Sequence, residues 1–207
     1  MEYKAIYPSS KVANTALSVC FTKTELLSVG VGIDSVDFNP AYYNKTEFRK
    51  LYDLWKDPLY LADFFEENES FFNVPYWQGV TEESFVKDVI KSSRLVFQQI
   101  DELLKSGMLL SLFESLDEAE DSKRKRGYKF KVKAKYGYIS NKMAFRFYGI
   151  IVDEDTICIT GGAIKIVLEM KDAPNTAIEL KKMEMVSRDL ESNGVFDKES
   201  FIDFIAE

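Results

Sequence analysis

The chain has 207 residues, of which 46% are hydrophobic and 14% aromatic, and this is ample for a buried core in one domain or two small ones. It contains no histidine and only two cysteines, Cys20 and Cys158, which are far apart. Histidine-dependent catalysis, zinc thiolate sites and a disulfide framework are therefore excluded. The formal net charge of −7 argues against an anionic partner until the distribution of charge along the chain is considered.

No run approaches the roughly 18 apolar residues that span a bilayer. The start of the chain also lacks a basic segment followed by an apolar one. We therefore expect a cytoplasmic protein without a membrane partner. The acidic stretches "EENES" and "DEAED" lack the ligand spacing of a carboxylate metal loop, so we predict no metal and no cofactor.

The first half of the chain predicts short β-prone pieces followed by helices. "KAIYP", "TALSVCFT" and "LLSVGVGI" lie within residues 1–43 and are punctuated by proline and glycine. Asn44 and Glu47 have the spacing of a capping box, which predicts a helix over about 45–56. "DPLYLADFFEE" predicts a second, short helix, and a long amphipathic helix is expected to run from after Thr81 to Gly107.

The second half predicts an antiparallel meander and two helices. Strands are expected over about 127–137, 142–152 and 155–167, with "YISNK" and "DEDT" as the turns. Thr176 and Glu179 have the spacing of a second capping box, at the start of a helix that ends at "NG". A final amphipathic segment, "KESFIDFIAE", is expected to dock on the core.

Together these elements predict an α+β fold, in which an N-terminal helical region packs on a C-terminal antiparallel β-meander that is followed by an amphipathic helix. The expected division is residues 1–115 for the mostly helical region, 116–126 for a charged loop, and 127–207 for the sheet and the last helices. One compact domain over the whole chain is the alternative.

Charge is concentrated in one segment. Residues 122–152 contain ten Lys or Arg and no Asp or Glu, which leaves 17 basic and 34 acidic residues for the rest of the chain. Within "YKFKVKAKYGY" every second residue is a lysine, and these four are Lys129, Lys131, Lys133 and Lys135. Such a segment can hold phosphates even on an acidic protein, because association depends on the local potential.

The lysine row has two interpretations. Lysines on the outer face of a strand provide ordinary solvation, and on an edge strand they prevent association between sheets. However, like charges without intervening acids repel one another, and the next strand adds Arg146 beside Tyr148. Cations next to an aromatic ring suit phosphates and bases, so contact of the lysines and Tyr148 with RNA or DNA is slightly favoured.

The glycine pair in "ITGGAIK" is a second candidate site. It matches neither of the glycine-rich phosphate-binding motifs, so a bulge or close backbone packing is favoured over phosphate binding. Lys165 directly follows and stays of interest.

The segments "AFRFYGIIVDEDTICITGGAIK" and "TAIELKKMEMVSRDL" resemble the HigB/RelE-like toxin superfamily, particularly its phage-derived HigB-like branch. Arg146 matches the arginine of a central strand of that family and Lys165 the lysine after the following strand, while "TAIELKK" matches the opening of its last helix. The resemblance covers about residues 127–192.

The resemblance implies an endoribonuclease that cleaves messenger RNA on the ribosome and is held inactive by an antitoxin protein. In such a reaction the 2′-hydroxyl attacks the adjacent phosphate, and Arg146 and Lys165 would stabilise the charge that develops on the phosphoryl oxygens. Lys165 or a lysine within residues 129–135 would be the general base.

Two other functions stay open. One is a non-catalytic accessory protein, related to phage or mobile elements, whose basic strand binds nucleic acid or an acidic protein. The other is a structural protein whose lysines only protect a sheet edge.

Overall fold

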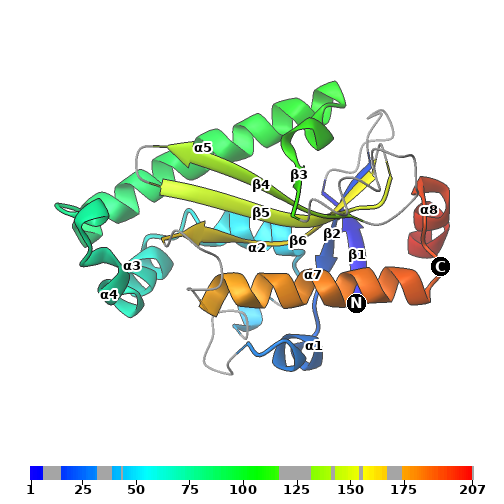
Figure 1. The fold of residues 1–207 in the computed structure, drawn as a ribbon, viewed down its shortest axis with the longest axis horizontal. Coiled ribbons are helices and arrows are strands. Elements are labelled where there is room, and N and C mark those ends of the chain that lie inside the picture. Colours follow the sequence, from blue (N-terminus) through cyan, green and yellow to red (C-terminus); the bar gives the residue numbers. More distant parts are fainter. Residues whose placement is uncertain are drawn as a thin grey trace.

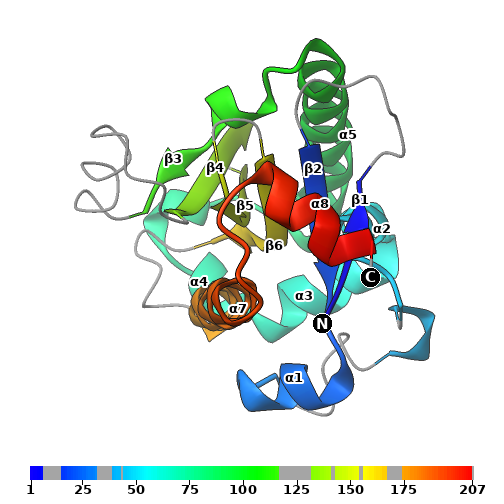
Figure 2. The ribbon, with the colours of Figure 1, turned by 90° about the vertical axis from the view of Figure 1, so that its right-hand side faces the viewer.

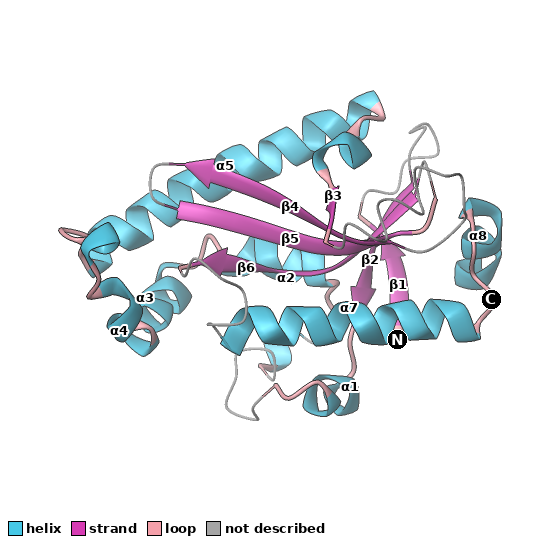
Figure 3. Cartoon of the chain, viewed as in Figure 1, coloured by secondary structure: helices cyan, strands magenta, loops and turns pink. Residues whose placement is uncertain are grey.

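The computed structural model describes residues 1–6, 15–31, 39–42, 44–116, 132–140, 143–153, 156–166 and 174–206. Within these ranges a six-stranded sheet lies between helices, which confirms the predicted α+β class (Figures 1 and 3). In chain order the strands are β1 (Glu2–Ala5), β2 (Thr15–Cys20), β3 (Glu114–Ser115), β4 (Val132–Ser140), β5 (Met143–Ile151) and β6 (Thr156–Lys165).

The strands are ordered β1-β2-β6-β5-β4-β3 across the sheet, so β4, β5 and β6 form the predicted antiparallel meander. The first predicted turn is too long, because the ladder between β4 and β5 continues to the pair Ser140 and Met143. "YIS" therefore belongs to the strand. Residues 127–131, the predicted start of this strand, lie outside the described residues.

The N-terminal strands join the same sheet, which the sequence did not predict. β1 pairs with β2, and β2 runs parallel to β6 with Thr15 opposite Thr156 and Ser18 opposite Ile159. The sheet is therefore mixed and contains strands from both predicted regions, while the division into 1–115, 116–126 and 127–207 stays a prediction.

The prediction for the third β-prone piece, "LLSVGVGI", is wrong over its first three residues. They belong to the short helix α1 (Lys23–Ser28). Thr22 begins this helix with a capping box. Its hydroxyl accepts a hydrogen bond from the Glu25 amide at 3.3 Å, and its own amide donates to the Glu25 carboxylate at 2.7 Å. The two reciprocal bonds satisfy amide groups that a helix start leaves unpaired.

The longer helices agree with the predicted ones. They are α2 (Glu47–Leu54), α3 (Pro58–Glu67), α5 (Glu82–Ser106), α7 (Pro174–Ser192) and α8 (Lys198–Ala206), whereas the single turn α4 (Glu69–Phe72) was not predicted. Short 3-10 turns are η2 (Pro40–Tyr42), η3 (Pro75–Trp77) and η4 (Leu109–Leu112). α5 ends as predicted at Gly107, which adopts a left-handed φ of 73°. No helix among the described residues is both long and apolar enough to cross a membrane.

Alternate residues of the strands build two cores, one on each face of the sheet. Phe145 and Phe147 pack with α2, α3 and α5, and Tyr148 and Ile150 pack with α7 and α8. Figure 1 shows α5 and α7 on either side of the sheet, and Figure 2 shows α7 end-on. The end of the chain docks as predicted, because Phe201 of α8 is buried against Tyr3 of β1 with ring centroids 5.7 Å apart.

Neither predicted capping box forms as expected. The N-cap of α2 is Thr46, whose hydroxyl accepts from the Arg49 amide at 3.2 Å. α7 begins at Pro174, so Thr176 lies inside the helix. Both glutamates, Glu47 and Glu179, instead turn into the protein and are buried.

Candidate functional site

The predicted lysine row is only partly described. Lys129 and Lys131 lie outside the described residues. Lys133 and Lys135 occupy positions on β4 directly opposite Ile150 and Tyr148 of β5. Because residues alternate between the two faces of a strand, these two positions belong to the same face of the sheet as Tyr148 and Ile150. On β5 and β6 this face is covered by α7.

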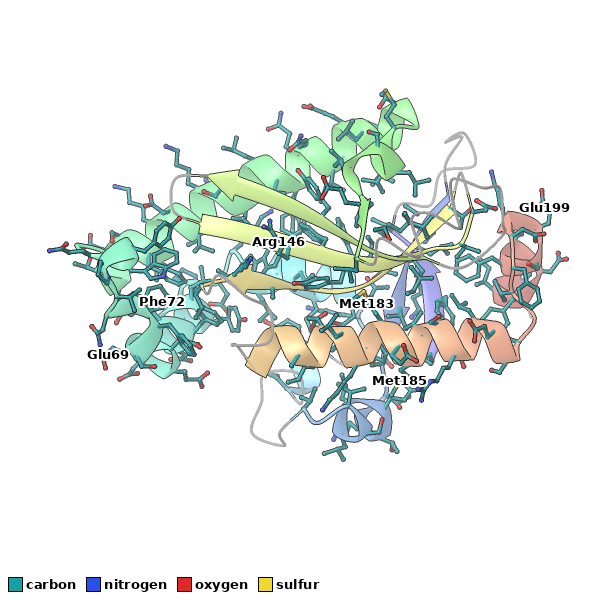
Figure 4. All side chains as sticks on the ribbon, viewed as in Figure 1. Glu69, Phe72, Arg146, Met183, Met185 and Glu199 are labelled. Atoms are coloured by element: carbon teal, nitrogen blue, oxygen red, sulfur yellow. The ribbon has the colours of Figure 1, made fainter. Side chains whose placement is uncertain are left out.

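Arg146 and Lys165, the predicted catalytic pair, are brought together. Arg146 lies opposite Ala163, and Lys165 lies opposite Ala144, so the two are diagonal neighbours on the same face of β5 and β6. Diagonal positions are about 7–8 Å apart, within reach of long side chains. Both are partly exposed, and the Arg146 guanidinium donates to the Phe145 carbonyl at 3.3 Å (Figure 4).

Tyr148 does not fit its predicted role in RNA contact. Its side chain is 0% exposed and packs in the core beneath α7. Its hydroxyl has no hydrogen-bond partner within the described part of the chain. Burial raises the pKa of Tyr148, Glu179 acts in the same direction, and Arg146 opposes them. A ring enclosed in this way cannot stack on a base, so Tyr148 is removed from the candidate contacts.

Gly161 and Gly162 lie at a bulge and in close packing, as the favoured interpretation of the glycine pair predicted. A bulge leaves Thr160 out of register between the pairs Tyr148–Gly161 and Gly149–Ile159. A Cβ at position 161 would collide with the Glu179 carboxylate. A Cβ at position 162 would come within 2.7 Å of the Arg146 carbonyl oxygen and of Leu51. Both positions therefore need glycine for close approach.

Four charged side chains form a buried network beside this glycine pair. Lys50 binds Glu47 at 2.6 Å, Lys182 binds Glu47 at 3.0 Å, and Lys182 binds Glu179 at 2.8 Å. All four side chains are at most 6% exposed. We call these residues the buried ion network. It connects α2 with α7, which cover opposite faces of the sheet.

The buried ion network lies just beyond the point where the parallel pairing of β2 with β6 ends. β2 pairs only with the first residues of β6, up to Ile159, and the glycine pair follows directly. At this point the Ser18 hydroxyl donates to the Ile159 carbonyl and accepts from the Phe48 amide, each at 3.0 Å. These bonds hold the first turn of α2 against β6, and beyond them α2 and α7 meet.

Hydrogen bonds from the described residues satisfy the Glu179 carboxyl group only in part. One oxygen accepts from Lys182, and the other, Oε2, has no hydrogen-bond partner among the described residues. The pKa of Glu179 is raised to about 7, because burial and the charge of Glu47 raise it by more than Lys182 and Lys50 lower it. A carboxyl that titrates near neutrality can exchange a proton at physiological pH.

A pocket leads from the surface to the network. Its lining comes from α1, α2 and the segments before them, and consists of Phe21, Lys23, Leu26, Tyr42, Lys45, Glu47 and Lys50. Lys45 at its rim binds Asp53 at 2.8 Å, while Glu47 and Lys50 form its inner wall. The buried charges are therefore reached from one side.

Sequence reasoning missed the network. Glu47 and Glu179 were assigned to helix caps, and Lys50 and Lys182 were assigned no role. The available signal was the E-x-x-K spacing, which occurs at the start of both helices and puts each pair on one helical face. In both helices this spacing adjoins large apolar residues, such as Phe48 and Met183, which are buried. This could have indicated that the charged side chains face the core.

The described residues contain no group of three or more His, Cys, Asp or Glu side chains that could hold a metal ion. Comparison of the chain with protein-family models, with curated proteins and with solved structures finds no match. The relationship to the HigB/RelE-like superfamily therefore stays a prediction that rests on the motifs alone.

Proposed function

We propose that this chain binds RNA on the face of the sheet that carries Arg146 and Lys165, and that it cleaves messenger RNA on the ribosome as a HigB/RelE-like toxin. The observation that supports the proposal is the diagonal placement of these two cations on adjacent strands. Lys133 and Lys135 occupy positions on the same face and extend the basic surface. We place the protein in the cytoplasm, with an antitoxin protein as its regulator.

In the proposed reaction the 2′-hydroxyl oxygen attacks the adjacent phosphorus and the bond to the 5′ oxygen breaks, which leaves a 2′,3′-cyclic phosphate. The proton of the hydroxyl goes to a neutral lysine base, either Lys165 or a lysine within residues 129–135, and the leaving 5′ oxygen takes a proton from water. The Arg146 guanidinium suits two phosphoryl oxygens at once and would stabilise their developing charge.

A non-catalytic RNA-binding protein is the second candidate. Glu179, a carboxyl on this face of the sheet, is buried under α7 and out of reach of a polymer. If no lysine of the basic surface acts as a base, the same cations would hold RNA without cutting it.

The test is cleavage of RNA by the purified protein, with and without ribosomes. We expect Arg146→Ala to abolish cleavage and Arg146→Lys to reduce it strongly, because lysine cannot form the bidentate contact. Arg94→Ala is the matched control, since Arg94 is exposed on α5 and should leave cleavage unchanged. A wild-type protein that binds RNA without cleaving it would support the second candidate. A protein that neither binds nor cleaves RNA would refute both.

A further inference from the structure

The buried ion network holds two helices that cover opposite faces of the sheet. Lys182 of α7 is bound both to Glu179 of its own helix, at 2.8 Å, and to Glu47 of α2, at 3.0 Å. Removing charges from water is costly unless every lone pair and proton is satisfied. This condition is not met at Glu179, whose Oε2 is buried without a hydrogen-bond partner in the described structure.

The surroundings of Glu179 set its response to pH. Lys182 lies on its own helix, Glu47 and Lys50 face it from α2, and β5 contributes Tyr148, which is itself close to Arg146. β6 contributes Gly161, against which the Glu179 carboxylate packs. With both glutamates ionised the network is neutral, but Oε2 of Glu179 then carries negative charge in the core without a hydrogen-bond donor among the described residues.

Protons can reach the network. The pocket between α1 and α2 is lined by Glu47 and Lys50, so one end of the network faces an opening while Glu179 lies at the other end. Proton exchange at Glu179 can therefore occur in the folded protein through small movements and does not need global unfolding.

We propose that the four side chains Glu47, Lys50, Lys182 and Glu179 form a proton-controlled lock between α2 and α7, in which proton uptake by Glu179 tightens the packing of α7 on the sheet and proton loss weakens it. A neutral carboxyl removes the unsatisfied negative charge from the contact with Gly161. Lys182 also has Glu47 as a partner, at 3.0 Å, so it does not lose its only carboxylate partner when Glu179 is protonated. This lock does not depend on the proposed RNA function.

The direction of the pH effect follows from the raised pKa. Because the pKa of Glu179 in the folded chain, about 7, lies above that of an ordinary glutamate, the folded state binds the proton more tightly than the unfolded state. The stabilisation is complete below the ordinary pKa and is lost as the pH rises through about 7. Through this window the contribution of Glu179 raises the unfolding equilibrium constant by up to about tenfold per pH unit.

Two methionines of α7 allow the lock to be observed. Met183 is buried between α7 and the sheet, one turn beyond Glu179, whereas Met185 is on the other side of the helix near α1 (Figure 4). Methyl-labelled methionine would be followed by NMR between pH 5 and pH 9. We expect the Met183 signal to shift or broaden with a one-proton transition near neutral pH, and the Met185 signal to change much less.

Two substitutions connect the transition to the network. Glu179→Gln should abolish the Met183 transition, while Glu191→Gln, at an exposed glutamate of the same helix, should leave it intact. Glu47→Gln should move the midpoint to lower pH, because Glu47 raises the pKa of Glu179. This variant keeps the proposal testable if Glu179→Gln does not fold. A Met183 signal that is constant from pH 5 to pH 9, or a midpoint that does not move in Glu47→Gln, would overturn the proposal.

Discussion

The chain carries charge in two contrasting arrangements. The buried ion network consists of two acids and two bases, each within 3.0 Å of a partner of opposite charge and with almost no contact with water. The proposed basic surface consists of Lys133 and Lys135 on β4, Arg146 on β5 and Lys165 on β6, and the first three belong to the acid-free stretch 122–152 of the sequence. Charges of the first kind are fixed by their partners within the chain and affect stability, whereas we propose that charges of the second kind bind a partner outside the chain. The predictions below test this distinction.

The largest effect is expected from Lys182→Met. This change leaves Glu47 and Glu179 buried without their shared cation, and breaking a buried pair in this way costs about 3–5 kcal/mol. Lys181→Met is the matched control, because Lys181 is exposed on the same helix and should change the free energy of unfolding by less than about 0.5 kcal/mol. Urea denaturation measures both. Equal losses of unfolding free energy for the two variants would show that the buried ion network does not contribute to stability.

Gly161→Ala should have the next largest effect. The added Cβ displaces the Glu179 carboxylate from the network, and overpacking of this kind costs about 1–3 kcal/mol. The cost should fall in a chain that also carries Glu179→Ala, because the colliding group is then absent. A double-mutant cycle of unfolding free energies without coupling between the two positions would show that the glycine serves another purpose.

Two buried tyrosines should show effects of opposite direction, the larger of which is similar in size to the effect of Gly161→Ala. The Tyr3 hydroxyl donates to Asp189 at 2.6 Å, so Tyr3→Phe should destabilise the protein by about 1.5–3 kcal/mol. The Tyr148 hydroxyl has no such partner among the described residues, so Tyr148→Phe should be neutral or stabilising by about 1 kcal/mol. Thermal unfolding would compare them. A loss of stability in Tyr148→Phe as large as that in Tyr3→Phe would contradict this assignment.

The smallest effect on stability is expected from Lys133→Gln combined with Lys135→Gln. If these two lysines bind only a partner outside the chain, as proposed, removing their charges changes the free energy of unfolding by about 0.5 kcal/mol or less. RNA binding at low salt should nevertheless weaken, because two phosphate contacts are lost. If these lysines only prevent association between sheet edges, the double substitution will change the solubility of the protein and leave its affinity for RNA unchanged.

The sequence predicted those parts of the fold whose signals are local. α5 was predicted because its apolar residues repeat with helical spacing and because Thr81 and Gly107 mark its ends. The meander of β4, β5 and β6 was predicted from alternation and short turns. The parallel pairing of β2 with β6 was missed, because it joins residues 15–18 to residues 156–159 and leaves no local pattern.

The candidate site was predictable to a more limited extent. Arg146 and Lys165 were predicted as a catalytic pair, and the register of β5 and β6 places them at diagonal positions, while their role stays a prediction. Glu47 and Glu179 were misassigned to capping boxes. A glutamate three residues after an Asn or Thr gives the same sequence pattern whether its side chain caps the helix or faces the core. Tyr148 was misassigned because its burial depends on α7, which follows it by more than twenty residues.

The most direct test of the proposed RNA-binding face, which both candidate functions require, is the salt dependence of RNA binding. Affinity for a labelled single-stranded RNA would be measured between low and physiological salt for the wild-type protein and for Arg146→Ala combined with Lys165→Ala. We predict that the slope of log affinity against log salt is smaller in the variant by about 1.4, because each phosphate contact on a single strand contributes about 0.7. Equal affinities and equal slopes for the two proteins would show that RNA does not bind at this face.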